Sequence, residues 1–289
     1  MKLGGTASLK KQSQQENASP VAMAQEQLIQ FEFVPNGWRY LDTHPSVKGW
    51  ESIEILNVYK DKWSDYVSRL EETTPVSFTP ESPSNSIGDL ISQNTIMVFA
   101  YSLALSARGH KKISMLDWGG SIGHYYLLAR ALLPGVEIEY SCKDVPMIAD
   151  FGQKLLPNVS FYSDDTCLSK HYDFVLASGS LQYSKDWEKV LEGLARATKR
   201  NLLITRFPVL EQHSQFVFIQ RAYSYGYNTE YLAWCINRDL FLMHAEDLNL
   251  HLVREFVIGD DHEIHNAPEQ PKYLGFLFEK KGTGAYSNT

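Results

Sequence analysis

Residues 113–126 read Ile-Ser-Met-Leu-Asp-Trp-Gly-Gly-Ser-Ile-Gly-His-Tyr-Tyr, and this stretch decides the fold. A short apolar run ends at Asp117. The glycines that follow it are Gly119, Gly120 and Gly123, and a helix-forming segment comes next. An α/β fold uses a strand, a glycine turn and a helix in this order to bring its backbone close to a nucleotide-like cofactor. The sequence therefore predicts an α/β protein with a cofactor site at this turn.

The acidic side chain at the end of this strand distinguishes between two cofactors. The pyrophosphate of a dinucleotide lies at the N-terminus of the helix, where backbone N–H groups attract an anion, and the carboxylate of Asp117 would repel it. S-adenosylmethionine (SAM) has no phosphate and carries a sulfonium and an ammonium group, which a carboxylate attracts. The sequence therefore favours SAM over NAD.

The same stretch resembles motif I of the class I SAM-dependent methyltransferases, in which an acidic residue precedes a glycine-rich turn. Asp117 matches the acidic position, Gly119 the first glycine and Gly123 the third. Ser121 stands where the second glycine is usual, which is a departure from the motif. The resemblance implies a Rossmann-like fold in which this turn, with Gly120 and Ser121, binds SAM.

Acidic residues also follow the next two predicted strands. Asp144 comes 21 residues after Gly123, and an acidic residue at about this distance usually accepts hydrogen bonds from a ribose. Asp144 could also cap the helix predicted over 146–156. After the third strand, the class I resemblance implies that Asp164 contacts the adenine amino group, although adjacent aspartates are common in turns as well.

The string Ser-Gly-Ser-Leu-Gln-Tyr at 178–183 follows the fourth predicted strand. It resembles a string in a small subgroup of microbial methyltransferases, several of which are encoded near surface-polysaccharide genes. The resemblance covers about residues 52–281. It implies that Ser178 and Gly179 contact the cofactor and that Gln182 lies on the acceptor side.

Methyl transfer from a sulfonium is an in-line displacement, so alignment and the exclusion of water supply most of the catalysis. If the acceptor is a hydroxyl group, a base can take its proton, and His213 after the fifth strand is our candidate. Tyr183 could cover the methyl group or orient the acceptor. Arg206, at the end of the fifth strand, could hold an anionic acceptor or form a salt bridge.

The loop 259–271 contains the acidic and histidine-rich string Asp-Asp-His-Glu-Ile-His at 260–265. Its spacing fits none of the helical metalloenzyme motifs, so we predict no metal. In the class I fold this loop lies on the cofactor edge of the sheet. We therefore expect His262 and His265 to lie near the acceptor.

Composition excludes several other classes of protein. The chain has 289 residues, 44% of them hydrophobic, and a net charge of −7 without a basic stripe, which argues against a nucleic-acid substrate. Its three cysteines lack metal-ligand spacing and are odd in number, and the N-terminus does not resemble a signal peptide. The most apolar stretch, 95–107, is too short to cross a membrane. We expect a cytoplasmic protein with a small-molecule acceptor and no membrane partner; its oligomeric state is left open, with a homodimer as one option.

The expected organisation is a disordered tail (1–24), a helical cap and linker (25–86), a SAM-binding core (87–281) and a flexible C-terminus (282–289). The core should hold a seven-stranded, mostly parallel sheet with an antiparallel last strand.

Two parts of the core should be irregular. We expect 207–215 to be a connection and the aromatic-rich segment 223–234 to be a loop, and we expect the N-terminal segment 25–47 to be an irregular arm.

Together these observations predict a SAM-dependent methyltransferase that acts on a small polar molecule, with O-methylation of a sugar or related metabolite as the preferred reaction. An NAD-linked oxidoreductase on a Rossmann sheet is one alternative. A non-catalytic SAM-fold binding subunit is another, because Ser121 interrupts the glycine motif and no base is obvious.

Overall fold

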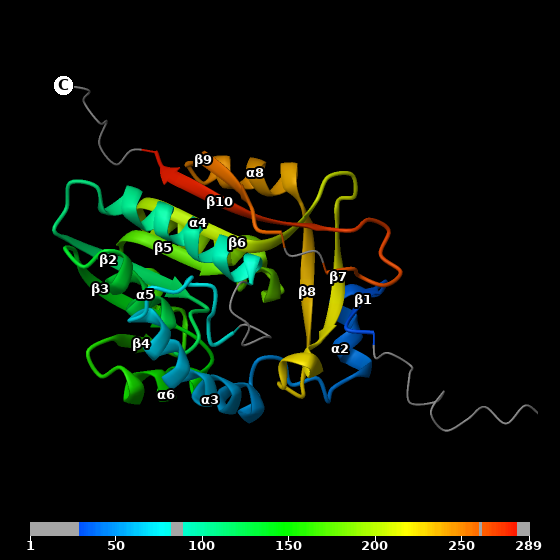
Figure 1. Cartoon of the computed structure of the whole chain (residues 1–289). Coiled ribbons are helices and arrows are strands. Elements are labelled where there is room, and N and C mark those ends of the chain that lie inside the picture. The colour runs from blue at the N-terminus through cyan, green and yellow to red at the C-terminus, as the bar shows by residue number, and fades with distance from the viewer. Residues whose placement is uncertain (1–28, 82–88, 260–261, 282–289) are drawn as a thin grey trace, which may run out of the picture.

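The computed structural model describes residues 29–81, 89–259 and 262–281. The predicted tails, 1–24 and 282–289, lie outside these residues. One large mixed sheet runs through the described part of the chain, and helices pack on its faces (Figure 1). The strands are β1 (Phe31–Val34), β2 (Lys112–Trp118), β3 (Glu137–Lys143), β4 (Ser160–Tyr162), β5 (Tyr172–Ser178), β6 (Thr198–Leu210), β7 (Gln215–Arg221), β8 (Glu230–Asn237), β9 (Leu250–Val257) and β10 (Lys272–Lys280).

The helices alternate with the strands in the core, as parallel strands require. The α-helices are α2 (Tyr40–Thr43), α3 (Ile53–Leu70), α4 (Leu90–Ala107), α5 (His124–Leu132), α6 (Pro146–Leu155), α7 (Trp187–Ala197) and α8 (Arg238–Asp247). Short 3-10 helices are η1 (Gly37–Arg39), η2 (Asp165–Ser169), η3 (Leu181–Tyr183) and η4 (Ala222–Tyr225).

The predicted seven-stranded sheet is present. Its order is β4-β3-β2-β5-β6-β10-β9, and β10 runs antiparallel to both of its neighbours. The pairs from β4 to β6 are parallel. This is the mixed α/β class with an antiparallel last strand that the sequence predicted.

Both faces of this sheet are buried, which explains why its central strands are almost continuously apolar. Along β5, Val175 and Ala177 pack on one face with α7 and α8. Phe174 and Leu176 pack on the other face with α4 and α5. The alternation follows from the two-residue period of a strand.

Three further strands extend the sheet beyond the predicted seven. Strand β7 pairs antiparallel with β1 on one side and with β8 on the other, and β8 pairs with the far end of β6 through Val209 and Leu210. The expectation of a connection at 207–215 was therefore wrong in its first part, because β6 continues to Leu210. The expected arm 25–47 contains β1 and is not wholly irregular.

The aromatic segment 223–234 is also not a loop throughout. Tyr231 and Trp234 lie in β8, whose residues are mostly buried. Aromatic and apolar side chains favour a half-buried pleated surface, so β propensity was the signal that indicated a strand there.

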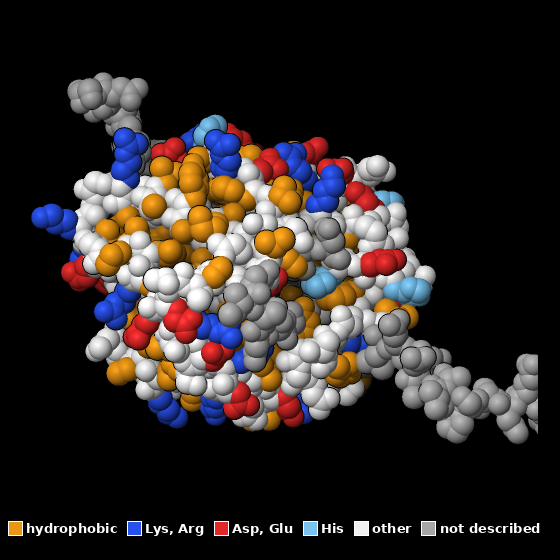
Figure 2. All heavy atoms as spheres, in the orientation of Figure 1, with side chains coloured by type: hydrophobic (Ala, Val, Ile, Leu, Met, Phe, Trp, Pro, Cys, Tyr) orange, Lys and Arg blue, Asp and Glu red, His pale blue; other side chains and the backbone are white. Residues whose placement is uncertain are grey.

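Helix α4 contains the whole apolar stretch 95–107 and begins at Leu90. It has 18 residues, so by length and composition it passes as a membrane span, the one such helix in the described part of the chain. Half of it is buried inside the fold, where Phe99 and Leu103 pack against the sheet. Its outer face carries the exposed side chains of Met97 and Tyr101, and hydrophobic side chains gather in this region in Figure 2.

The packing between α8 and the sheet provides a test of the fold. Phe241 of α8 is fully buried, and its ring lies 4.8 Å from that of Phe207 and 5.1 Å from that of Phe276. We expect Phe241→Ala to lower the free energy of unfolding by about 3–5 kcal/mol, because it leaves a cavity in the core. Met243→Ala, at a 58% exposed site in the same helix, should change it by less than about 0.5 kcal/mol. Urea unfolding measures both, and equal losses would show that α8 does not pack as described.

Candidate functional site

The glycine turn after β2 adopts a conformation that few residues tolerate. Gly119, Ser121 and Gly123 have φ values of 78°, 56° and 86°, a region that glycine enters without steric cost. The N–H groups of Gly119 and Gly120 donate to the carbonyl oxygen of Lys143, at 2.8 and 3.2 Å. The turn is therefore fixed to the carboxyl end of β3.

Close packing explains each of the three glycines. A Cβ atom on Gly119 would lie 2.4 Å from Cβ of Ser180. One on Gly120 would lie 2.4 Å from Cγ of Asp117, and one on Gly123 would lie 2.9 Å from a ring atom of Phe161. Only Gly119 of the three lines the pocket described next, so Gly120 and Gly123 shape the turn from beneath.

A pocket of about 1100 Å³, including its open mouth, lies at the carboxyl ends of β2, β3 and β5 and beside Arg206 of β6. The predicted site residues that line it are Gly119, Ser121, Asp144, Ser178, Gly179, Gln182, Tyr183, Arg206 and His262. Those that do not line it are Asp117, Gly120, Gly123, Asp164, His213 and His265. The sheet edge thus brings most of the predicted residues together, as expected for open α/β sheets.

Asp117 lies under the glycine turn, away from the pocket. Its side chain is fully buried and accepts a hydrogen bond from the Tyr140 hydroxyl. Burial raises the pKa of Asp117 well above its usual range. The expected direct attraction between this carboxylate and a cationic cofactor is therefore not supported, because the turn folds back over it.

Asp144 joins β3 to the glycine turn. Its carboxylate accepts hydrogen bonds from the backbone N–H of Ser121 at 2.7 Å and of Val145 at 2.8 Å. Burial raises the pKa of Asp144 to about 6, against the opposing effect of these two hydrogen bonds. The first turn of α6 has no side-chain cap and its N-cap is Val145, so the helix-cap alternative for Asp144 does not hold.

The loop after β5 is attached to the glycine turn as well. The Ser180 hydroxyl donates to the carbonyl oxygen of Trp118 at 2.7 Å, and Ser178 Oγ lies 3.0 Å from the Tyr125 hydroxyl. Gly179, with φ of 59°, donates its N–H to Thr205 at 2.8 Å. These bonds align the ends of three strands around one pocket.

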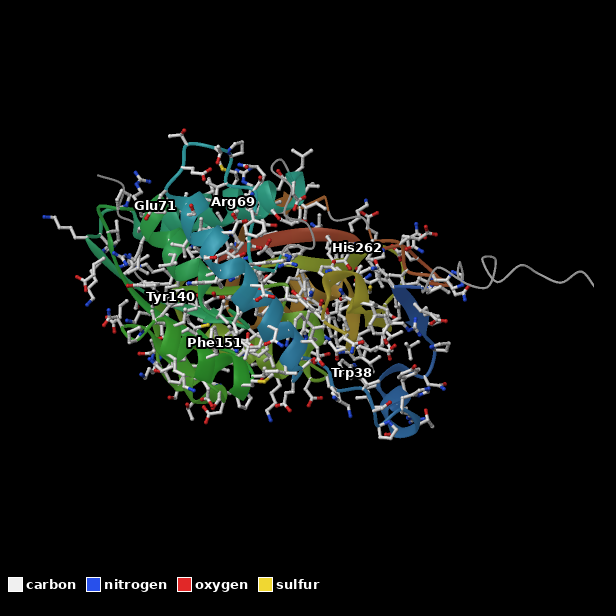
Figure 3. All side chains as sticks on the ribbon, turned by 60° about the horizontal axis from the view of Figure 1, so that its bottom comes forward. Trp38, Arg69, Glu71, Tyr140, Phe151 and His262 are labelled. Carbon is white, nitrogen blue, oxygen red and sulfur yellow. The ribbon has the colours of Figure 1, made fainter. Side chains whose placement is uncertain are left out.

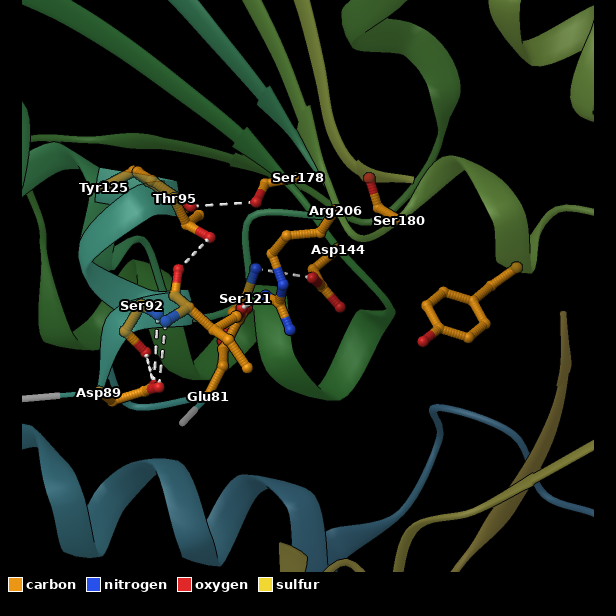
Figure 4. Close-up of polar contacts among 12 residues, drawn as sticks. Glu81, Asp89, Ser92, Thr95, Ser121, Tyr125, Asp144, Ser178, Ser180 and Arg206 are labelled. Atoms are coloured by element: carbon orange, nitrogen blue, oxygen red, sulfur yellow. Dashed lines mark hydrogen bonds and ion pairs between the residues drawn. The ribbon is translucent and has the colours of Figure 1, made fainter. Parts of the chain in front are cut away.

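Arg206 enters the pocket from β6 and forms an ion pair with Glu81. Arg206 Nη1 lies 2.8 Å from Glu81 Oε2, and both side chains are largely buried. Figure 4 shows Arg206 reaching toward Glu81 and Ser121, with Asp144 beside it. The salt-bridge alternative for Arg206 is the one that forms. Nothing in the proline-rich segment around Glu81 marked it in the sequence as part of a site.

An aromatic wall faces the glycine turn. Trp50 stacks on Tyr231 with ring centroids 4.4 Å apart, and Tyr183 lies edge-on to both rings at 5.0 Å. The Tyr183 hydroxyl donates to Oε1 of Gln220 at 3.0 Å. Most of this wall comes from the segment before α3 and from β7 and β8, outside the seven-stranded sheet.

The two histidines of the loop before β10, His262 and His265, lie in different environments. His262 lines the pocket and stacks on Phe31 with ring centroids 4.5 Å apart. In the view of Figure 3, His262 lies to the right of α3 and Tyr140 to its left. His265 is exposed, and its backbone pairs with β1 through Phe31 and Phe33. No group of three His, Cys, Asp or Glu side chains suited to a metal occurs within the described ranges, which leave out 260–261.

His213 and Asp164 lie on the surface. Because β6 continues to Leu210, His213 is carried past the pocket, and its backbone N–H donates to Glu269 at 2.7 Å. Asp164 caps η2 through the N–H of Thr166 at 3.0 Å. The structure therefore brings neither residue to the pocket.

Several solved structures are similar to this chain at low sequence identity. A sarcosine dimethylglycine methyltransferase from Galdieria sulphuraria, so named without proof of its activity, has 17% identity and a TM-score of 0.48, covering 76% of this chain and 97% of its own. A 1,6-didemethyltoxoflavin-N1-methyltransferase from Burkholderia thailandensis, solved with S-adenosylhomocysteine (SAH), has 15% identity and a TM-score of 0.42, covering 79% and 90%. A SAM-dependent methyltransferase from Clostridium acetobutylicum has 10% identity and a TM-score of 0.43, covering 65% and 91%.

No protein-family model matches the chain, and neither does any curated protein sequence. The TM-scores of these three structures are all below 0.5.

The contact between Gly119 and Ser180 provides a test of the turn. We expect Gly119→Ala to lower the free energy of unfolding by about 2–4 kcal/mol, because the new methyl group combines an unfavourable φ with a steric clash. The added substitution Ser180→Gly should recover part of this loss. Gly135→Ala is the control, since a Cβ there has open space. Thermal and urea unfolding measure these effects, and native-like stability in Gly119→Ala would contradict the described packing.

Proposed function

We propose that this chain is a SAM-dependent methyltransferase. The observation that carries the proposal is the placement of two carboxylates, Asp144 and Glu81, beside the glycine turn in one pocket. Asp144 suits ribose hydroxyls, and Glu81, which is paired with Arg206, suits a cofactor that also carries a cationic group. NAD has ribose hydroxyls as well, so the NAD-linked alternative is separated from SAM by titration with both ligands.

Buried polar atoms in the pocket fit such a cofactor. Ser121 Oγ and Gln182 Oε1 are buried without a hydrogen-bond partner in the structure, and buried polar groups normally have one. Asp144 would accept hydrogen bonds from the ribose hydroxyls. SAM, when bound, supplies an electrophilic methyl group on its sulfonium. The protein would align the reactants and exclude water.

The acceptor we propose is a small polar molecule, with O-methylation of a sugar or related metabolite as the preferred reaction. The aromatic wall offers flat apolar surfaces, and Gln220 and Tyr183 add neutral hydrogen-bonding groups. Tyr183 donates its proton to Gln220, so it would orient an acceptor rather than take a proton from it. His262, which lines the pocket, replaces His213 as our candidate base.

The cofactor proposal is tested by calorimetric titration of the native chain with SAH and with NAD. We expect SAH to bind at least about a hundredfold more tightly, a difference of about 2.7 kcal/mol. Preferential binding of NAD would support the oxidoreductase instead. Tight SAH binding without transfer of labelled methyl to any sugar or extract pool would support a non-catalytic SAM-binding subunit.

Asp144 provides a test of the ribose contact. We expect Asp144→Asn to weaken SAH binding by about 1–3 kcal/mol, the range for a hydrogen bond to a charged group. The ionised carboxylate is the acceptor and its pKa is about 6, so native affinity should fall as the pH decreases from 7.5 to 5. The variant should lose this pH dependence, and an unchanged pH profile in Asp144→Asn would exclude Asp144 as its source.

The same pKa predicts the opposite trend for the stability of the empty protein. The pKa of Asp144 is raised on folding, to about 6 from an ordinary value of 3.8. Its contribution to stability is therefore fully present below the unfolded pKa and is lost as the pH rises through about 6. Melts of native and Asp144→Asn protein between pH 4 and 8 isolate this contribution.

A further inference from the structure

The ion pair between Arg206 and Glu81 joins two distant parts of the chain inside the pocket. Arg206 belongs to β6, and Glu81 lies 125 residues earlier, in the segment that follows α3. Their relative side-chain exposures are 29% and 15%. A pair this far from bulk solvent is weak evidence for stability, because desolvation of the charges offsets much of their attraction.

The backbone of Arg206 has an unusual conformation. Arg206 has φ of 55°, a left-handed conformation that is uncommon for residues other than glycine and that is concentrated at functional sites. The guanidinium lies against Gly179, 3.4 Å from where a Cβ atom would stand. Gln182 donates to the Arg206 carbonyl at 3.3 Å. Several features of the fold therefore direct one cation into the pocket.

Glu81 lies within electrostatic reach of the glycine turn. After burial, which is the larger cause, its negative charge helps to raise the pKa of Asp117 and of Asp144. The buried hydroxyl of Ser121 has no partner, and Ser121 lines the same pocket as this pair. One cation and one anion thus stand together at the turn that contacts the cofactor in our proposal.

We propose that Arg206 and Glu81 bind the amino-acid end of the cofactor, with the guanidinium on its α-carboxylate and the Glu81 carboxylate on its α-ammonium group. This inference rests on the proposed function. A zwitterion offers one charge of each sign, so both protein charges exchange their partner and neither is left unpaired in the pocket. An anionic acceptor, our sequence-based assignment for Arg206, would meet the repulsion of Glu81.

The test compares two ligands that differ in this end alone. SAH carries the ammonium and carboxylate groups, and 5′-methylthioadenosine keeps the adenosine and sulfur but lacks both. We expect native protein to bind SAH more tightly than 5′-methylthioadenosine. Glu81→Gln and Arg206→Gln should each weaken SAH binding by about tenfold or more, which is about 1.4 kcal/mol, and change binding of 5′-methylthioadenosine by less than about twofold. Calorimetry measures all of these affinities.

Two further variants serve as controls. Arg206→Lys keeps the positive charge and should retain most of the preference for SAH. Glu255→Gln breaks a comparable, partly buried ion pair with Arg238, outside the pocket lining, and should leave both affinities unchanged. Melts without ligand check that each variant is folded.

The outcomes separate this inference from the proposed function. Equal losses for the two ligands in Glu81→Gln, or an unchanged preference for SAH, would overturn the zwitterion site and leave SAM binding intact. Equal affinity of the native protein for both ligands would also overturn it. Failure of the native protein to bind either ligand would instead refute the proposed function itself.

Discussion

The hydrogen bond from the Ser121 N–H to the Asp144 carboxylate is the contact on which the pocket depends. It connects the glycine turn after β2 to the end of β3, 2.7 Å from donor to acceptor. The Ser180 hydroxyl fixes the same turn to the loop after β5 through Trp118. With three strand ends joined in this way, the turn can hold left-handed backbone conformations that would otherwise relax.

Small side chains are a consequence of this arrangement. The loops after β2 and β5 approach so closely that Gly119 has no room for a Cβ atom beside Ser180. At Gly179 a Cβ atom would meet the guanidinium of Arg206 at an ordinary contact distance of 3.4 Å, and it is the φ of 59° that favours glycine there. The same absence of side chains that allows the loops to meet keeps the backbone accessible from the pocket, where a cofactor can approach it.

The pocket has two sides with different origins. The side with the glycine turn belongs to the seven-stranded sheet, except for Glu81, which comes from the segment after α3. The opposite side comes largely from the segment before α3 and from β7 and β8, and Trp50, Tyr183 and Tyr231 give it an aromatic surface. The acceptor would therefore be recognised by segments outside the seven-stranded sheet, which can vary in sequence without disturbing that sheet.

Local sequence was sufficient for the strand, turn and helix around residues 113–126, because periodicity and glycine placement act over a few residues. It also predicted that Asp144, Ser178 and Arg206 lie in one site, because parallel strands place their carboxyl ends on one edge of the sheet. All three line the pocket. It did not predict that Asp117 is buried or that His213 lies outside the pocket. Those outcomes depend on how the turn folds back and on how far β6 extends.

Only the tertiary structure decided the partner of Arg206. Glu81 lies in a proline-rich segment whose composition indicates a linker, and it becomes part of the pocket through contacts 125 residues apart in sequence. Long-range contacts also explain why residues 230–237 form strand β8, because this strand pairs with β7 and with the end of β6. Short-range patterns determine which elements form, whereas long-range packing determines which charges meet, because a charge selects its partner by distance in space.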